Sequence, residues 1–160
     1  MSTTVESELD RKLHRVRRLS NSYRSLFNWP TTVDSKTCSI SLRIGEVVDA
    51  LTMRAGFAAE VNNILTVHMM HAPIIVAPGT PDDWIFLTQP RTELRASTWE
   101  DLIRIQVEWR QPGSLIVLPN EQNASQGRRW LNGPTVGREL PPWSAVVAAA
   151  RSASTLRGRW

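Results

Sequence analysis

The side chains that could do acid–base or metal chemistry are scattered along the chain. His68 and His71 are three residues apart, so they could share one helical face, although we expect one core-facing and one surface histidine. Two imidazoles do not make a zinc site, and no cysteine or carboxylate at motif spacing completes the ligand set. We therefore predict that the chain holds no metal ion and no cofactor.

The carboxylates and the cysteine give no catalytic pattern either. Asp82-Asp83 and Glu100-Asp101 are adjacent pairs, and adjacent residues on a strand point to opposite faces. No D-x-D or D-x-E pair is present for two-metal phosphoryl transfer, and neither glycine-rich phosphate-loop motif occurs. Cys38 is the single cysteine and lies in a predicted strand, which favours a small packed thiol. The sequence therefore favours a protein that is not an enzyme, although an active site assembled from scattered residues stays open.

Tryptophan and arginine form the one pattern that suggests a binding surface. The chain has seven tryptophans, and arginine stands beside several of them. Such pairs can stack bases and bind phosphate, and both residue types are also common at protein interfaces. Most of the tryptophans are expected in the core, with Trp130 and Trp160 the best candidates for exposure. The candidate nucleic-acid-binding residues are Arg128, Arg129, Trp130, Arg138 and Arg157.

Length and charge point to one small domain. The 160 residues are 41% hydrophobic, which suffices for a core, and the net charge of +4 with a pI near 10.2 permits a nucleic-acid partner without requiring one. No apolar run approaches the roughly 18 residues of a membrane-spanning helix, and the polar start lacks the apolar stretch of a secretory signal. We therefore expect a cytoplasmic protein with no membrane contact.

The first 27 residues predict an amphipathic helix. Leu9, Leu13, Val16, Tyr23 and Phe27 recur at steps of four and three residues and form one apolar stripe with arginines around it. The stripe could dock on the chain's own domain, which the short length favours, or pair with a partner or a second copy through a short heptad seam. The candidate partner-binding residues are Leu9, Leu13, Val16 and Tyr23.

The rest of the chain predicts an α+β fold, with a mostly antiparallel sheet of short strands packed by two or three helices. The polar–apolar alternation at 38–44 is typical of a half-buried strand, and with 31–33 and 47–53 it suggests an antiparallel meander. Further strands are expected at 74–76, 84–87, 104–109, 114–118 and 128–131, and further helices at 56–70, 97–102 and 143–153. We expect a single domain over 28–154, a loop over 119–127 and a C-terminal tail over 155–160.

Five short segments carry a resemblance to a known family: TVD at 32–34, GEVVDAL at 45–51, WIFL at 84–87, the strand and its flanks at 113–119, and RWL at 129–131. Their order resembles small actinobacterial proteins that are similar to the N-terminal domain of bifunctional DNA primase-polymerases. The resemblance covers about residues 23–150 and implies an α+β sheet domain. That enzyme family uses acidic metal ligands and a histidine motif, both missing here, so the resemblance implies a non-catalytic relative.

These observations lead to two functional hypotheses. The first is a non-catalytic binding or regulatory module that acts through contacts with another protein or with its own copy. The second is a nucleic-acid-associated accessory protein, acting in DNA replication or transcription, that uses an Arg/Trp surface. Binding that weakens as salt rises would distinguish the second from the first.

Overall fold

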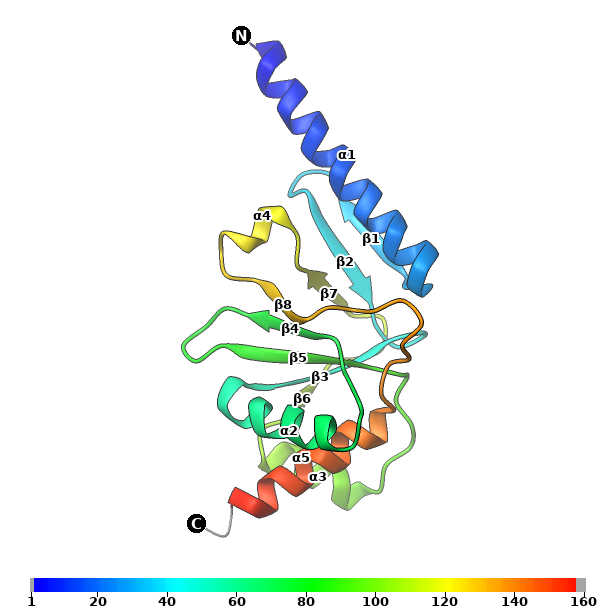
Figure 1. Cartoon of the computed structure of the whole chain (residues 1–160), viewed down its shortest axis with the longest axis vertical. Helices are drawn as coiled ribbons and strands as arrows, with labels where there is room; N and C mark the ends of the chain where they lie inside the picture. The colour runs from blue at the N-terminus through cyan, green and yellow to red at the C-terminus, as the bar shows by residue number, and fades with distance from the viewer. Residues whose placement is uncertain (1, 158–160) are drawn as a thin grey trace.

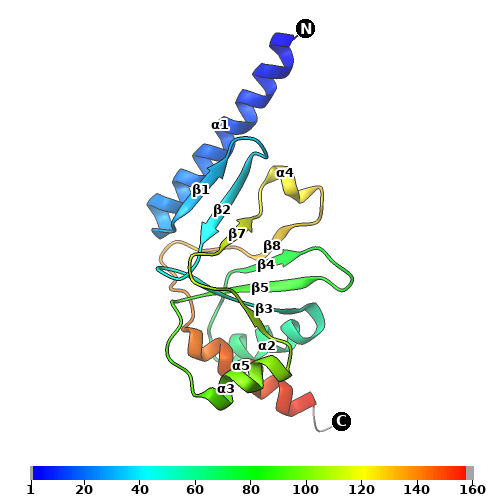
Figure 2. The same ribbon diagram turned by 180° about the vertical axis from the view of Figure 1, so that it is seen from behind.

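A computed structural model of the chain describes residues 2–157, and the side chains of residues 8–155. This part of the chain forms five helices and eight strands (Figures 1 and 2). The helices are α1 (Ser2–Phe27), α2 (Ala55–Val67), α3 (Ala96–Arg104), α4 (Glu121–Ala124) and α5 (Trp143–Arg157). The strands are β1 (Thr31–Asp34), β2 (Ser39–Arg43), β3 (Asp49–Arg54), β4 (Ile74–Ala77), β5 (Asp83–Thr88), β6 (Glu108–Trp109), β7 (Leu115–Leu118) and β8 (Arg129–Asn132).

The strands form two antiparallel sheets rather than the one sheet that the sequence predicted. The smaller sheet has the order β1-β2-β7, and the larger has the order β6-β3-β5-β4-β8. The α+β class with antiparallel pairing is confirmed. The predicted meander is wrong at its third strand, because β2 pairs with β7 on its second edge while β3 joins the other sheet.

Several strands are continuously apolar because each face of the larger sheet packs into a separate hydrophobic core. Alternate residues of β3, β4 and β5 point to opposite faces of the larger sheet, and both faces are covered. Leu51 and Phe86 face a core shared with α2, α3 and α5, whereas Ala50, Ile85 and Leu87 face a core shared with the smaller sheet and α1. Figure 1 shows the resulting order of layers, from α1 through the two sheets to the three helices.

Helix α1 has no glycine or proline and ends where the sequence predicted. Asn28 takes a left-handed conformation with φ of 58°, and the Trp29 amide donates to the Tyr23 carbonyl, which is the pattern of a helix C-cap. The end of the helix is tied to β1, since Ser20 Oγ lies 2.8 Å from Thr31 Oγ1. The N-terminal half extends away from the sheets in both views (Figures 1 and 2).

Several boundaries differ from the prediction for local reasons. Residues 119–127 contain α4, whose capping box joins the side chains and backbone amides of Asn120 and Asn123. Only two residues of the strand predicted at 104–109 pair as β6, since α3 continues to Arg104. Helix α5 continues to Arg157, so the chain between 155 and 157 is not the predicted tail, and residues 158–160 lie outside the described part. None of the described helices has the length and apolar character to cross a membrane.

Candidate functional site

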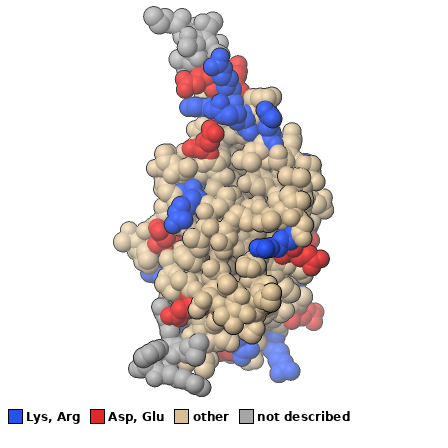
Figure 3. Space-filling view, viewed as in Figure 1, with Lys and Arg blue, Asp and Glu red and all other residues tan. Residues whose placement is uncertain are grey.

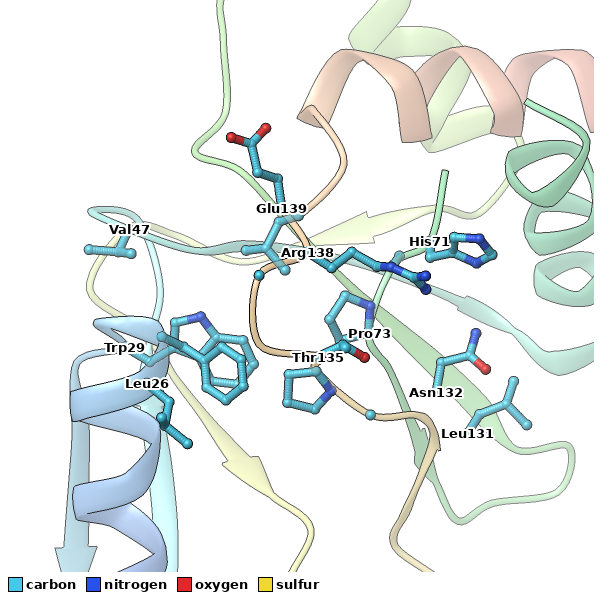
Figure 4. Close-up of a pocket in the computed structure, with 16 residues that line it drawn as sticks. Leu26, Trp29, Val47, His71, Pro73, Leu131, Asn132, Thr135, Arg138 and Glu139 are labelled. Carbon is cyan, nitrogen blue, oxygen red and sulfur yellow. The ribbon is translucent and has the colours of Figure 1, made fainter. Parts of the chain in front are cut away.

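A cleft of about 670 Å³ opens where α1 ends, beside the segment 131–140 (Figure 4). Four separate stretches of chain form it: the end of α1 with the residues after it, Val47 between β2 and β3, the turn before β4, and the segment 131–140. Each stretch is short, and the stretches are distant from one another in the sequence. The cleft therefore exists only in the folded chain.

One side of the cleft is apolar. Trp29 is buried beneath it, with its ring centroid 5.5 Å from that of Tyr23 in a stacked pair and 5.1 Å from that of Phe27. Leu26 lines the cleft with 55% of its surface exposed. An exposed aliphatic side chain beside a concave aromatic surface is typical of a contact site for another molecule.

The other side of the cleft is polar. His71, Asn132, Thr135 and Arg138 line it, and Figure 4 shows the Arg138 side chain extending toward His71. The Arg138 amide donates to the Thr135 carbonyl and closes a turn in which Gly137 has a φ of 82°, which favours glycine. The salt bridges found among the described side chains do not include Arg138. Its guanidinium is therefore available to an acceptor on a ligand.

The segment 131–140 is held at both ends. Its start belongs to β8, which pairs with β4 through Asn132 and Ile74. At its end, the side-chain amide of Gln89 donates to the Leu140 carbonyl at 2.9 Å, and the Gln89 backbone amide donates to the Pro141 carbonyl at 2.9 Å. The wall of the cleft is thus fixed to the central strands β4 and β5.

A buried ion pair stabilises the same region. The Asp49 carboxylate is fully buried and accepts from Arg91 Nε at 2.6 Å and from Arg91 Nη2 at 2.8 Å. Two backbone amides, of Ala50 and Arg91, complete its hydrogen bonds. The guanidinium also lies over the Trp143 ring, 5.1 Å from its centroid. The pair joins β3 to the chain after β5 and to the start of α5, and it has a structural role.

The side chain of Trp130, predicted as a nucleic-acid-binding residue, makes contacts within the fold. Its Nε1 donates to the Tyr23 hydroxyl at 3.3 Å, and its ring packs against those of Tyr23 and Trp29. Burial raises the pKa of Tyr23, and the hydrogen bond from Trp130 acts in the opposite direction. The half-buried indole therefore holds α1 on the larger sheet and does not offer an open ring for stacking.

Arg128, a second predicted nucleic-acid-binding residue, also has a structural role. β7 is the last strand of its sheet, and Arg128 Nε donates to the Val117 carbonyl at 2.7 Å on its free edge. Arg110 Nη1 donates to the next outward carbonyl, that of Leu115, at 2.8 Å. Burial lowers the pKa of Arg128, and the nearby charge of Arg110 lowers it further. The two arginines cover an edge that would otherwise be open to pairing with another strand.

The remaining predicted nucleic-acid-binding residues are not brought together. Arg129 is exposed on β8, and Arg138 lies at the cleft. Arg157 ends α5, and its side chain lies outside the described residues. The predicted Arg/Trp surface is therefore not a single surface.

The predicted partner-binding stripe on α1 divides into two parts. Val16 and Tyr23 are buried in the chain's own core, so the prediction that they contact a partner is wrong for the folded chain. Leu13 is partly buried against the same core, whereas Leu9 is 57% exposed. Docking on the chain's own domain, the first of the two alternatives, describes the stripe from Val16 onward.

The cleft residues Leu26 and Asn132 were not singled out from the sequence, and His71 was considered only as a metal ligand. Leu26 is one residue off the apolar stripe, and its exposure follows from the way α1 is seated on β1. Both His68 and His71 are exposed, so the expectation of a core-facing histidine is wrong. Within the described part of the chain, no three histidine, cysteine, aspartate or glutamate side chains gather as a group that could hold a metal ion.

Comparison of the chain with protein-family models, with curated proteins and with solved structures finds no match. The resemblance to the N-terminal domain of primase-polymerases therefore stays a prediction. Arguments about function have to come from the cleft and from the exposed surfaces of the chain itself.

Proposed function

We propose that this protein is a non-catalytic binding module that acts through contacts with another protein, and that the cleft beside α1 holds a segment of that partner. The observation that carries the proposal is the combination of exposed Leu26 with a free Arg138 on opposite sides of one cleft. The cytoplasmic location expected from the sequence belongs to the same proposal.

The apolar side of the cleft favours an aliphatic or aromatic side chain of the partner. Leu26 and Phe27 border the site, and Trp29 lies beneath them in a rigid aromatic cluster. Covering exposed apolar surface stabilises a complex by about 25 cal/mol per Å² removed from water. Since the aromatic cluster is already packed, the partner does not have to order it.

The polar side of the cleft favours a partner segment that carries a hydrogen-bond acceptor next to its apolar side chain. Arg138 offers a forked donor, and His71 and Asn132 offer further donors beside it. A carboxylate on the partner segment would therefore match this wall. We propose an extended segment that carries an apolar side chain next to an acidic one.

The test is recovery of partners by the full chain from its own cytoplasm, with and without nuclease. We expect a partner that survives nuclease treatment and that the Leu26→Asp/Arg138→Glu variant recovers poorly. Loss of one apolar contact and one charge contact amounts to about 2–3 kcal/mol, or roughly 30- to 160-fold weaker binding.

A matched control places the same two changes elsewhere on the surface. Val67 is a highly exposed aliphatic residue at the end of α2, and Arg95 is an exposed arginine before α3, so Val67→Asp/Arg95→Glu should recover the partner like the natural chain. Equal recovery by the cleft variant, or release of every partner by nuclease, would contradict the proposal.

A nucleic-acid-associated role is the second candidate function. The residues first predicted for it are dispersed, and two of them are occupied within the fold. What favours this role is a different set of arginines on α1, considered next.

A further inference from the structure

The outward face of α1 carries a line of arginines. Arg11, Arg15 and Arg18 are four and three residues apart, so they lie on one face of the helix and project in the same direction. The buried residues Val16 and Tyr23 lie on the opposite face. We call Arg11, Arg15 and Arg18 the arginine ridge, and all three are exposed.

The charge of this part of α1 is strongly positive. Between Glu8 and Arg18 the helix has five basic and two acidic residues, a net charge of +3 in a chain whose total is +4. Figure 3 shows these lysine and arginine side chains gathered on the helix where it extends beyond the body of the molecule. A clustered positive charge on an exposed element is the electrostatic pattern of a polyanion-binding surface.

The burial of the apolar stripe of α1 affects which kinds of partner the helix can bind. An interfacial membrane helix needs a free apolar face to insert among the lipids, and a partner helix needs a free apolar seam. On α1 the stripe from Val16 onward is already covered by the chain's own core, which leaves Leu9 as its one fully exposed position among the described residues. The free face is polar and basic, and that favours a partner recognised through its phosphates.

The shape of the element favours a duplex. An α-helix with its side chains is about 10–12 Å across, and the major groove of B-form DNA is about 12 Å wide. The N-terminal half of α1, which carries Arg11, extends away from the sheets in both views, so a groove can approach the ridge from that end, while Arg15 lies beside Glu121 of α4 (Figures 1 and 2). The ridge spans about 10 Å at about 1.5 Å per residue, which is enough to contact successive phosphates.

We infer that the arginine ridge of α1 binds the phosphate backbone of duplex DNA. The ridge shares no residue with the cleft, and the inference goes beyond the proposed protein contact. It also replaces the residues first predicted for nucleic-acid binding, since Arg128 and Trp130 are occupied within the fold. The resulting molecule holds a protein segment at one site and DNA at another.

Glu121 is the acidic neighbour of the ridge. Its carboxylate lies 3.4 Å from Arg15 Nε, and both side chains are more than half exposed. An ion pair this exposed is weak, so a phosphate can displace it. The same carboxylate repels an approaching phosphate, and this makes Glu121 a test of where DNA lies.

The experiment measures binding of the full chain to a labelled 20-base-pair duplex by fluorescence anisotropy at several salt concentrations. Three phosphate contacts predict a slope of about −2.7 in a plot of log affinity against log salt, or roughly 40-fold weaker binding between 50 and 200 mM. The Arg11→Gln/Arg15→Gln/Arg18→Gln variant should lose duplex binding. Glu121→Gln should tighten binding by about 1.5- to 5-fold at 50 mM.

The matched control removes three exposed arginines elsewhere. Arg43→Gln/Arg54→Gln/Arg95→Gln should keep the slope of the natural chain, and circular dichroism checks that both triple variants fold. The inference is overturned if the natural chain fails to bind duplex at 50 mM salt, or if the ridge variant keeps the slope. It is also overturned if a single strand of equal length binds as tightly, or if phosphatidylserine vesicles bind where duplex does not. Partner recovery by the cleft is scored separately, so either proposal can fail alone.

Discussion

Asp49→Asn tests how strongly the buried ion pair holds the two-sheet fold. The carboxylate is fully buried and accepts four hydrogen bonds, two of them from the Arg91 guanidinium at 2.6 and 2.8 Å. Asparagine has the same shape as aspartate, but one of the two acceptor oxygens becomes an NH2 group that faces the N–H donors of Arg91 or of the backbone. Removing one partner of a buried pair costs about 3–5 kcal/mol. Because 22% of the Arg91 side chain is exposed and can be hydrated, we expect the lower end, about 3 kcal/mol.

The measurement is urea unfolding followed by tryptophan fluorescence, to which Trp143 beneath Arg91 contributes. At a slope of about 2 kcal/mol per molar urea, a loss of 3 kcal/mol moves the midpoint down by about 1.5 M. Asp101→Asn is the control, because its arginine partners, Arg104 and Arg151, are 71% and 50% exposed, and such solvated ion pairs predict a change below about 1 kcal/mol. A midpoint shift of Asp49→Asn no larger than that of Asp101→Asn would refute the reasoning.

Two further predictions concern α1 and β7. Tyr23 is the single tyrosine, so the tyrosinate absorbance band reports it alone, and its pKa should lie above the ordinary value of 10 in the folded chain and return to it in urea. Because folding favours the neutral phenol, the free energy of unfolding should fall as pH rises above 10. A folded-state midpoint at or below 10 would contradict this burial. Arg110→Ser/Arg128→Ser uncovers two carbonyls on the free edge of β7, so light scattering should show an apparent mass that grows with concentration. An unchanged mass would mean that the arginines do not protect the edge.

The sequence was sufficient for the elements whose signal is local. The apolar stripe over the first 27 residues predicted α1, because helix periodicity depends on residues a few positions apart. The alternation in β2 predicted its buried and outward faces for the same reason. Fold class followed from the mixture of such segments.

The tertiary structure decided which strands pair and what the candidate site residues do. β2 takes β7 as its second neighbour through Ile40–Leu118 pairing across more than seventy residues, and no local pattern encodes that choice. Arg128 and Trp130 looked like a binding pair, yet long-range contacts with Val117 and Tyr23 occupy them.

The cleft itself joins the end of α1, Val47, the turn before β4 and the segment 131–140. Periodicity and residue type report what one segment prefers by itself. A cleft depends on how separate segments pack against one another, and that packing depends on contacts between buried residues that are distant in the sequence.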